Sequence, residues 1–164
     1  MIRLYDQGER GLERFSRTAL LLGEDAMEKL NSAHVAVFGI GGVGGYVCEA
    51  LARSGVGSFT LADSDTVALS NLNRQIIATE KSLGKFKTEA MKERILDINP
   101  KAKVEAVNVF YLPETAGSFD FSAYSYVADC VDTVTAKLLI IERAKASNVR
   151  VISSMGAGNK LDPA

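Results

Sequence analysis

Short apolar runs alternate with amphipathic stretches along most of the chain. Helices are predicted where apolar residues recur at helical spacing, in VGGYVCEALARSG, in residues 85–98 and in residues 134–146. Strands are predicted for the runs HVAVFG, SFTLAD, KVEAVNV, SYVADC and VRVISS. Strands that alternate with helices predict βαβ units, and therefore an α/β fold with a Rossmann-like, doubly wound and mostly parallel sheet.

A separate helical pattern precedes the first predicted strand. Between Leu12 and Leu30, the apolar residues Leu20, Leu21 and Met27 suit one or two amphipathic helices. This pattern predicts an N-terminal helical extension in front of the core.

The boundary between the extension and the core is set at the first strand. We expect the helical extension over residues 1–33 and the Rossmann-like core over residues 34–164, in a single domain, because 164 residues fit one ordinary domain. Residues 117–125 are expected to form an ordinary loop. The chain stops just after its last predicted strand, so we expect a fragment of a longer protein.

Composition and charge limit the class of protein. Hydrophobic residues make up 47% and charged residues 24% of the chain, which is typical of a soluble globular protein. The net charge of −1 leaves no global basic field that would attract nucleic acid. An RNA contact would therefore need a local basic patch. One cluster of basic residues could serve as this patch, although a solvated helix face is the usual explanation of such a cluster. Its members are Lys81, Lys85, Lys87, Lys92 and Arg94.

Neither the start of the chain nor its apolar runs indicate secretion or a membrane. MIRLYDQGER lacks the apolar core of a signal peptide, and the longest apolar run, residues 35–48, is glycine-rich and too short to span a bilayer. Cys48 and Cys130 have no metal-binding spacing and lie in apolar contexts, which favours buried, reduced thiols. We therefore expect a cytoplasmic protein that does not contact a membrane.

The segment GIGGVGG lies directly between a predicted strand and a predicted helix. Gly39, Gly41 and Gly44 have the spacing G-x-G-x-x-G, in which glycine lets the backbone turn tightly and approach a phosphate at a helix amino terminus. Asp63 stands at the end of the second predicted strand, where a carboxylate binds ribose hydroxyls. The alternative is a glycine turn kept for tight strand–helix packing. The combined pattern favours a nucleotide site.

Charged residues near this turn bear on which nucleotide is bound. The fourth predicted strand should lie beside the first, and this placement brings Asp132, which follows the fourth strand, toward the phosphates. Because a carboxylate repels phosphates, a cation such as Mg²⁺ must lie between them. Arg74 and Lys87 would neutralise a triphosphate, so these residues favour ATP over NAD. Taken singly, Arg74 and Lys87 also suit solvated helix charges, and Asp132 also suits a helix cap.

The other polar residues of the region have structural alternatives. Asp63 and Asp65 are typical turn formers, and Asn71 suits a helix cap. We expect Asp65 to shape the turn and Asp129 to be structural, held at the sheet end by backbone hydrogen bonds. His34, the one histidine, is expected at the surface.

Four segments together resemble a known family. GIGGVGG, DSDTVALSNLNRQ, GKFK and DCVD are similar to the adenylating family that includes ThiF, MoeB and the ubiquitin-activating enzymes. The resemblance implies a Rossmann-like domain that binds ATP and adenylates a carboxylate, usually as a homodimer. By position, the resemblance implies that Asp63 binds the ribose and that Asp132 binds Mg²⁺. It implies that Arg17 reaches the partner's ATP across the dimer, with Arg14 a weaker candidate. The residues that it places at the phosphates are Gly41, Gly42, Asn71, Arg74 and Lys87.

Two further stretches narrow the resemblance. RFSRTALLLGEDAMEKL and SSMGAGNKLDP look most like the tRNA threonylcarbamoyladenosine dehydratases, a subgroup of this family. That likeness implies activation of a side-chain carboxylate on tRNA by ATP, followed by ring closure and release of AMP. Arg74, Lys87 and Asp132 would be catalytic, because they stabilise charge on the departing pyrophosphate. A monovalent cation and a sulphur-transfer or carrier protein are further candidates as cofactor and partner.

Other functions share parts of this pattern. An enzyme that adenylates the C-terminal Gly-Gly of a small sulphur-carrier protein would use the same ATP chemistry with a different acceptor. An NAD-dependent oxidoreductase or a non-catalytic nucleotide sensor would also need the glycine turn. Family members that pass an acyl group to a thiol use a cysteine downstream of this domain, so Cys48 and Cys130 are not expected to form a covalent intermediate.

Overall fold

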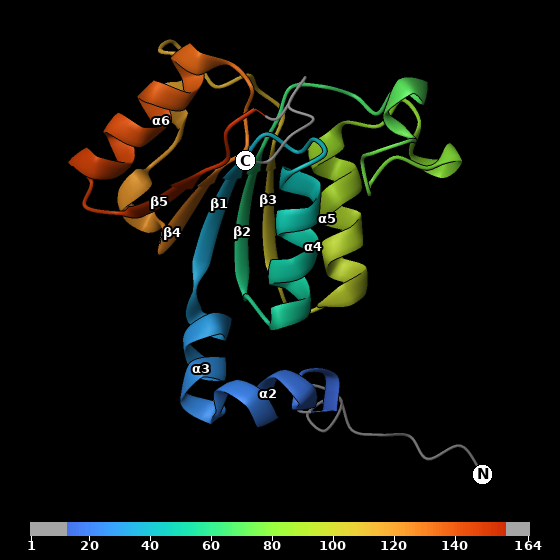
Figure 1. The fold of residues 1–164 in the computed structure, drawn as a ribbon, viewed down its shortest axis with the longest axis vertical. Coiled ribbons are helices and arrows are strands. Elements are labelled where there is room, and N and C mark those ends of the chain that lie inside the picture. Colours follow the sequence, from blue (N-terminus) through green and yellow to red (C-terminus); the bar gives the residue numbers. More distant parts are fainter. Residues whose placement is uncertain (1–12, 157–164) are drawn as a thin grey trace, which may run out of the picture.

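A five-stranded sheet forms the centre of the computed structural model, which describes residues 13–156 (Figure 1). The strand order is β3-β2-β1-β4-β5, and each neighbouring pair is parallel. The chain order therefore reverses beside β1, and the fourth strand lies next to the first, as predicted. The strands are β1 (His34–Phe38), β2 (Ser58–Ala62), β3 (Lys103–Val107), β4 (Tyr126–Asp129) and β5 (Arg150–Ser153).

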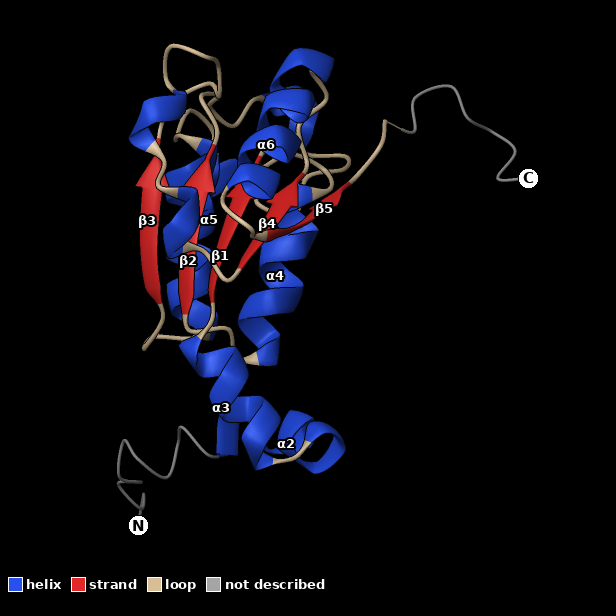
Figure 2. Cartoon of the chain, turned by 90° about the vertical axis from the view of Figure 1, so that its left-hand side faces the viewer, coloured by secondary structure: helices blue, strands red, loops and turns tan. Residues whose placement is uncertain are grey.

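Helices cover both faces of the sheet (Figure 2). One face packs against α4 (Gly44–Ser54) and α5 (Lys87–Ile98), and the other against α6 (Val134–Ala146). Alternate side chains of β1 enter the two cores: Val35 and Val37 join the α4–α5 side, while Phe38 joins the α6 side. This alternation is the expected result of the two-residue period of a strand that is buried on both faces. The predicted α/β fold is confirmed.

One helix begins later than the sequence predicted. The expected helix over residues 85–98 starts at Lys87, because Phe86 pairs with Thr66 in an isolated antiparallel bridge. The carbonyl of Lys85 also accepts a hydrogen bond from the N–H of Val67, at 2.8 Å. Lys85 and Phe86 fit the helical period but are thus held by the segment after β2. That segment also contains the short 3₁₀ turns η1 (Leu69–Asn71) and η2 (Glu80–Ser82).

Residues 117–125 were expected to be an ordinary loop, and that expectation is wrong. The segment contains most of η3 (Ala116–Ser118) and the whole of η4 (Phe121–Ala123), and it belongs to the core. Phe119 and Phe121 are fully buried, with ring centroids 5.1 and 5.7 Å from that of Phe38. Aromatic residues scattered among small polar ones have no helical or strand period, so the pattern gives no sign of this burial.

The helical extension lies beyond the amino ends of the strands, where α3 leads directly into β1 (Figure 1). Its two described helices are α2 (Ser16–Leu22) and α3 (Glu24–Ser32). Leu30 packs against the core as expected, but Leu20 and Leu21 are 84% and 83% exposed and do not face it. The outer parts of the predicted extension and core, residues 1–12 and 157–164, lie outside the described residues. Within residues 13–156, no helix is long and apolar enough to cross a membrane.

Candidate functional site

The glycine turn connects β1 to α4 at the carboxyl end of the sheet. Two of its glycines are required by the chain itself. Gly39 has a φ of +86°, and a Cβ at this residue would lie 2.8 Å from the carbonyl oxygen of Cys130. A Cβ at Gly44 would lie 1.8 Å from the carbonyl oxygen of Gly39. Tight packing between strand and helix, without any ligand, therefore explains why Gly39 and Gly44 are glycines.

Two further glycines of the turn, Gly41 and Gly42, are not explained by packing. A Cβ at Gly41 would meet no atom closer than Nε2 of Gln75, at 3.9 Å. At Gly42 the nearest atoms belong to Arg74, at 3.8 and 4.0 Å. Neither glycine has a positive φ. The turn thus offers bare backbone at the start of α4, where the first N–H groups of a helix lack intrahelical partners.

Asp63 fastens the glycine turn to the end of β2. One carboxylate oxygen, Oδ2, accepts a hydrogen bond from the N–H of Ile40 at 2.6 Å, and Oδ1 accepts one from the N–H of Asp65 at 2.8 Å. The side chain is only partly buried. Its turn-forming role is therefore present in the structure, and the carboxylate lies beside the turn that would hold a nucleotide.

Lys87 and Asp65 form an ion pair next to Asp63. The Nζ of Lys87 lies 2.6 Å from Oδ2 of Asp65, and the lysine side chain is 8% exposed whereas the aspartate side chain is 65% exposed. The backbone N–H of Lys87 also donates to the carbonyl of Asp65, at 2.9 Å. Lys87 is therefore not a solvated helix charge, and Asp65 holds its ammonium group in addition to shaping the turn.

The segment after η1 brings Arg74 and Gln75 to the open glycines. Arg74 is exposed, and its guanidinium donates to the carbonyl of Ser70 at 2.8 Å. Asn71 is buried and accepts a hydrogen bond from the N–H of Ala68 at 3.0 Å, so it stabilises the turn.

Gln75 is a candidate that residue types alone did not single out. Its side chain is buried and directed at Gly41, and its Oε1 has no hydrogen-bond partner within residues 13–156. A buried amide oxygen without a partner is costly, which makes it a candidate ligand-binding group. The available signal was its position next to Arg74, at the end of NLNRQ.

Asp132 lies in the exposed loop between β4 and α6. Its one hydrogen bond within the described chain comes from the hydroxyl of Thr133, at 3.4 Å. Thr133 is the N-cap of α6, which has no side-chain cap hydrogen bond, so Asp132 does not act as the cap. No group of three or more His, Cys, Asp or Glu side chains converges in residues 13–156. A cation here would be held by one carboxylate and otherwise by ligand and water oxygens.

The cysteines lie near the turn but are poorly suited to nucleophilic chemistry. Cys48 is fully buried, and burial raises the pKa of its thiol far above the usual range. Cys130 is partly buried, and burial together with the charge of Asp129 raises its thiol pKa to about 11. Because the thiolate is the nucleophile, neither cysteine is reactive at neutral pH.

Asp129 and His34 both have side-chain partners that the sequence did not indicate. Asp129 is fully buried, as expected of a structural residue, and its carboxylate contacts Lys137 and Ser153 besides a backbone N–H. His34 is not a plain surface residue. It is partly buried, and its Nε2 lies 2.9 Å from the hydroxyl of Thr60.

The N-terminal arginines are remote from the glycine turn of their own chain. They belong to the helical extension beyond the amino ends of the strands, whereas the turn follows the carboxyl end of β1 (Figure 1). Arg17 is exposed, and the guanidinium of Arg14 donates to the carbonyl of Ile98. Arg17 is thus the better placed of the two to meet another molecule.

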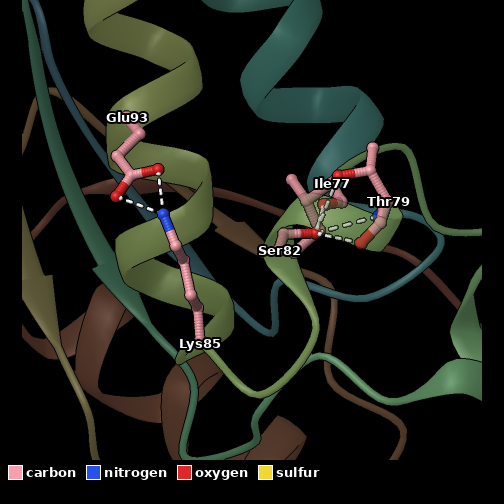
Figure 3. A network of polar contacts seen from close by, with 5 residues as sticks. All are labelled: Ile77, Thr79, Ser82, Lys85 and Glu93. Atoms are coloured by element: carbon pink, nitrogen blue, oxygen red, sulfur yellow. Dashed lines mark hydrogen bonds and ion pairs between the residues drawn. The ribbon is translucent and has the colours of Figure 1, made fainter.

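The predicted basic cluster on and before α5 is partly neutralised. Lys85 forms an ion pair with Glu93 at 2.7 Å (Figure 3), and Arg94 binds Glu49 through a hydrogen bond of 2.9 Å. Figure 3 also shows Ser82 accepting from the N–H of Thr79, which closes η2 beside the lysine. The acids make this surface mixed in charge, which favours the solvated-face explanation for Lys85 and Arg94 but not for the buried Lys87.

Comparison with known proteins finds consistent relatives. The ThiF family model matches residues 15–161. The tRNA threonylcarbamoyladenosine dehydratase of Bacillus subtilis (strain 168) is 44% identical over 93% of this chain and 60% of its own length. The molybdopterin-synthase adenylyltransferase of Salmonella typhimurium (strain LT2) is 34% identical over 91% of this chain and 59% of its own length.

Solved structures agree with the sequence comparison. The E. coli tRNA N6-threonylcarbamoyladenosine dehydratase TcdA, in complex with ATP, superposes with a TM-score of 0.88 and 41% identity, covering 93% of this chain and 63% of that one. The chain thus spans less than two thirds of the length of these relatives.

Proposed function

The chain belongs to the ThiF family, and on that premise we propose that it provides the nucleotide site of an ATP-dependent adenylating enzyme. Its substrate is threonylcarbamoyladenosine in tRNA, which the enzyme cyclises with loss of water. The names of the relatives from Bacillus subtilis and E. coli support this choice of substrate. The NAD-dependent alternative has no comparable support.

The open glycine pair is the observation that carries the proposal. Gly41 and Gly42 leave bare backbone that chain packing does not use, and the atom nearest a Cβ at Gly41 is the side-chain amide nitrogen of Gln75, a hydrogen-bond donor, at 3.9 Å. Arg74 adds a positive charge beside Gly42. A triphosphate would fill this space, accept hydrogen bonds from the N–H groups of the turn, and have its charge neutralised.

Acidic residues that follow β2 and β4, the two strands on either side of β1, would complete the nucleotide site. Asp63, beside the turn, would bind the ribose hydroxyls, and its hydrogen bond to the N–H of Ile40 holds the carboxylate in place. Asp132 would hold Mg²⁺ bound to the phosphates, since its carboxylate is exposed and no basic side chain neutralises it within the described chain. A monovalent cation is a further candidate, to be tested by exchanging potassium for choline in the binding assay.

The proposed reaction has two displacements. A carboxylate oxygen of the substrate attacks the α-phosphorus of ATP and expels pyrophosphate, and an internal nucleophile then attacks the acyl carbon and expels AMP. Lys87 and Arg74 stabilise the negative charge that develops on the pyrophosphate, and Asn71 positions the phosphates. The ion pair with Asp65 keeps the ammonium of Lys87 oriented before the nucleotide binds. Cys48 and Cys130 take no part.

We extend the proposal to a cytoplasmic homodimer. Leu20, Leu21 and Leu22 of α2 expose apolar side chains on the helix that also carries Arg17. Burying these leucines against a second copy would bring Arg17 toward the partner's nucleotide, which it does not approach in its own chain.

The decisive assay is ATP–pyrophosphate exchange by the full-length protein. We expect exchange to be stimulated by tRNA that contains threonylcarbamoyladenosine and not by the unmodified tRNA. Stimulation only by a small sulphur-carrier protein ending in Gly-Gly would refute the proposed substrate. Calorimetric binding of NADH but not ATP would refute the adenylating function itself.

A further inference from the structure

A buried ion pair joins three elements at the carboxyl end of the sheet. Asp129 ends β4 and is 0% exposed, and Lys137 lies in the first turns of α6 and is 7% exposed. The Nζ of Lys137 lies 2.8 Å from Oδ2 of Asp129. None of the roles assigned to the nucleotide site uses this pair.

The hydrogen bonds of the pair form a closed network. The ammonium of Lys137 contacts three oxygens: Oδ2 of Asp129, the hydroxyl of Ser153 at 3.3 Å and the carbonyl of Ser154 at 2.7 Å. The other carboxylate oxygen, Oδ1 of Asp129, accepts from the N–H of Val131 at 3.2 Å, and Oδ2 also accepts from the hydroxyl of Ser153 at 2.5 Å. An ammonium group has three donors, so its capacity is fully used.

Stability alone is a weak reason for such a pair. Removing two charges from water costs several kcal/mol per ion, and apolar residues of similar volume often replace a buried ion pair without loss of stability. A fully hydrogen-bonded pair instead fixes the relative positions of the elements that it joins. These elements are the end of β4, the start of α6 and the end of β5.

The pair also lies one residue from the contact between β4 and the glycine turn. The N–H of Cys130 donates to the carbonyl of Phe38 at 2.8 Å, and the backbone of Cys130 closes on Gly39. Val131, which donates to Asp129, immediately precedes Asp132. Asp129 and Lys137 therefore hold both ends of the short loop that presents Asp132.

We propose that Lys137 is a positioning residue: through Asp129, Ser153 and Ser154 it fixes the loop of residues 131–133 so that the carboxylate of Asp132 faces the glycine turn. Its functional consequence rests on the proposed ATP site. Because the loop is already ordered before the nucleotide binds, Asp132 can contact a nucleotide-bound Mg²⁺ without a further loss of conformational entropy in the loop.

The test uses a double variant that removes both charges at nearly constant volume, Asp129→Asn with Lys137→Met, in the full-length protein. Lys145→Met is the matched control, because Lys145 is an exposed lysine on the same helix. Without nucleotide, amide exchange at Val131, whose N–H donates to Asp129, should accelerate at least about tenfold, as expected for a local opening, while β1 and α4 remain protected.

The second measurement is the Mg²⁺ requirement of ATP binding, by calorimetry. The Mg²⁺ concentration for half-maximal binding should rise about tenfold in the double variant, whereas ATP affinity without Mg²⁺ should not change. A folded double variant with wild-type exchange at Val131 would overturn the proposal, and so would accelerated exchange with an unchanged Mg²⁺ requirement. If the wild-type protein binds no ATP, the proposed function fails, and the exchange measurement alone decides whether Lys137 positions the loop.

Discussion

Replacing Gly42 by alanine should separate the nucleotide site from the fold. In the structure a Cβ at this position meets only Arg74, at 3.8 and 4.0 Å, which is ordinary van der Waals contact. Because φ is not positive here, alanine brings no backbone strain. We therefore expect the free energy of unfolding to change by no more than about 0.5 kcal/mol.

The same methyl group should strongly impair ATP binding. It would occupy the space through which a phosphate approaches the backbone N–H groups of the turn. Losing one charge-assisted hydrogen bond costs about 1.5–3 kcal/mol, which corresponds to a roughly ten- to hundredfold weaker Kd. Gly41→Ala should behave in the same way, because its nearest neighbour is the side-chain amide of Gln75 at 3.9 Å.

Gly44→Ala is the contrasting variant. Its Cβ would lie 1.8 Å from the carbonyl oxygen of Gly39, so the backbone must shift. Overpacking of this kind costs about 1–3 kcal/mol or more, and each kcal/mol lowers the Tm of a domain of this size by about 2–4 °C.

Thermal unfolding and ATP titration calorimetry on the three variants distinguish the two roles. Gly117→Ala is the control, since a Cβ there meets no atom within 4 Å. ATP affinity at the wild-type level in a folded Gly42→Ala protein would refute the argument that the open glycines admit phosphates.

Three further predictions concern the metal, the thiols and pH. Asp132→Ala should abolish the Mg²⁺ dependence of ATP binding measured by calorimetry, and unchanged dependence would exclude this residue as the metal ligand. Cys48 and Cys130 should react with iodoacetamide at pH 7 far more slowly in the folded than in the denatured protein, because burial raises both thiol pKa values; rapid labelling by mass spectrometry would contradict this. Burial lowers the pKa of His34 in the folded state, so the unfolded chain binds more protons as pH falls below about 6.5, and stability decreases. The fall in Tm between pH 7.5 and 5.5 should therefore be smaller for His34→Gln than for the wild-type protein. An equal fall in both proteins would show that protonation of His34 does not cause the loss of stability.

The parts of the fold that follow from local period were predictable. The five strands and the helix over residues 134–146 occur where the apolar pattern indicated them, and the position of the fourth strand beside the first followed from the topology of doubly wound sheets. The pattern failed where distant segments decide the structure. Phe86 leaves the helix to pair with Thr66, and Phe121 enters the core from an aperiodic segment.

The site could be predicted residue by residue but not as a set of partners. Glycine spacing located the turn, yet only the structure separates Gly44, which packing requires, from Gly42, which it does not. The pairing of Lys87 with Asp65 joins positions that no local period relates. Gln75 carries no charge that would mark it in the sequence, and it becomes a candidate only because the structure buries it next to Gly41.

Isotope transfer tests the proposed adenylation most directly. The carboxylate of threonylcarbamoyladenosine in tRNA would be labelled with heavy oxygen and incubated with the full-length protein, ATP and Mg²⁺. Attack of the carboxylate on the α-phosphorus leaves one of its oxygens on the released AMP, so mass spectrometry should find the label in AMP in proportion to the cyclised nucleoside. Cyclised product with unlabelled AMP, or with the label in inorganic phosphate, would contradict adenylation.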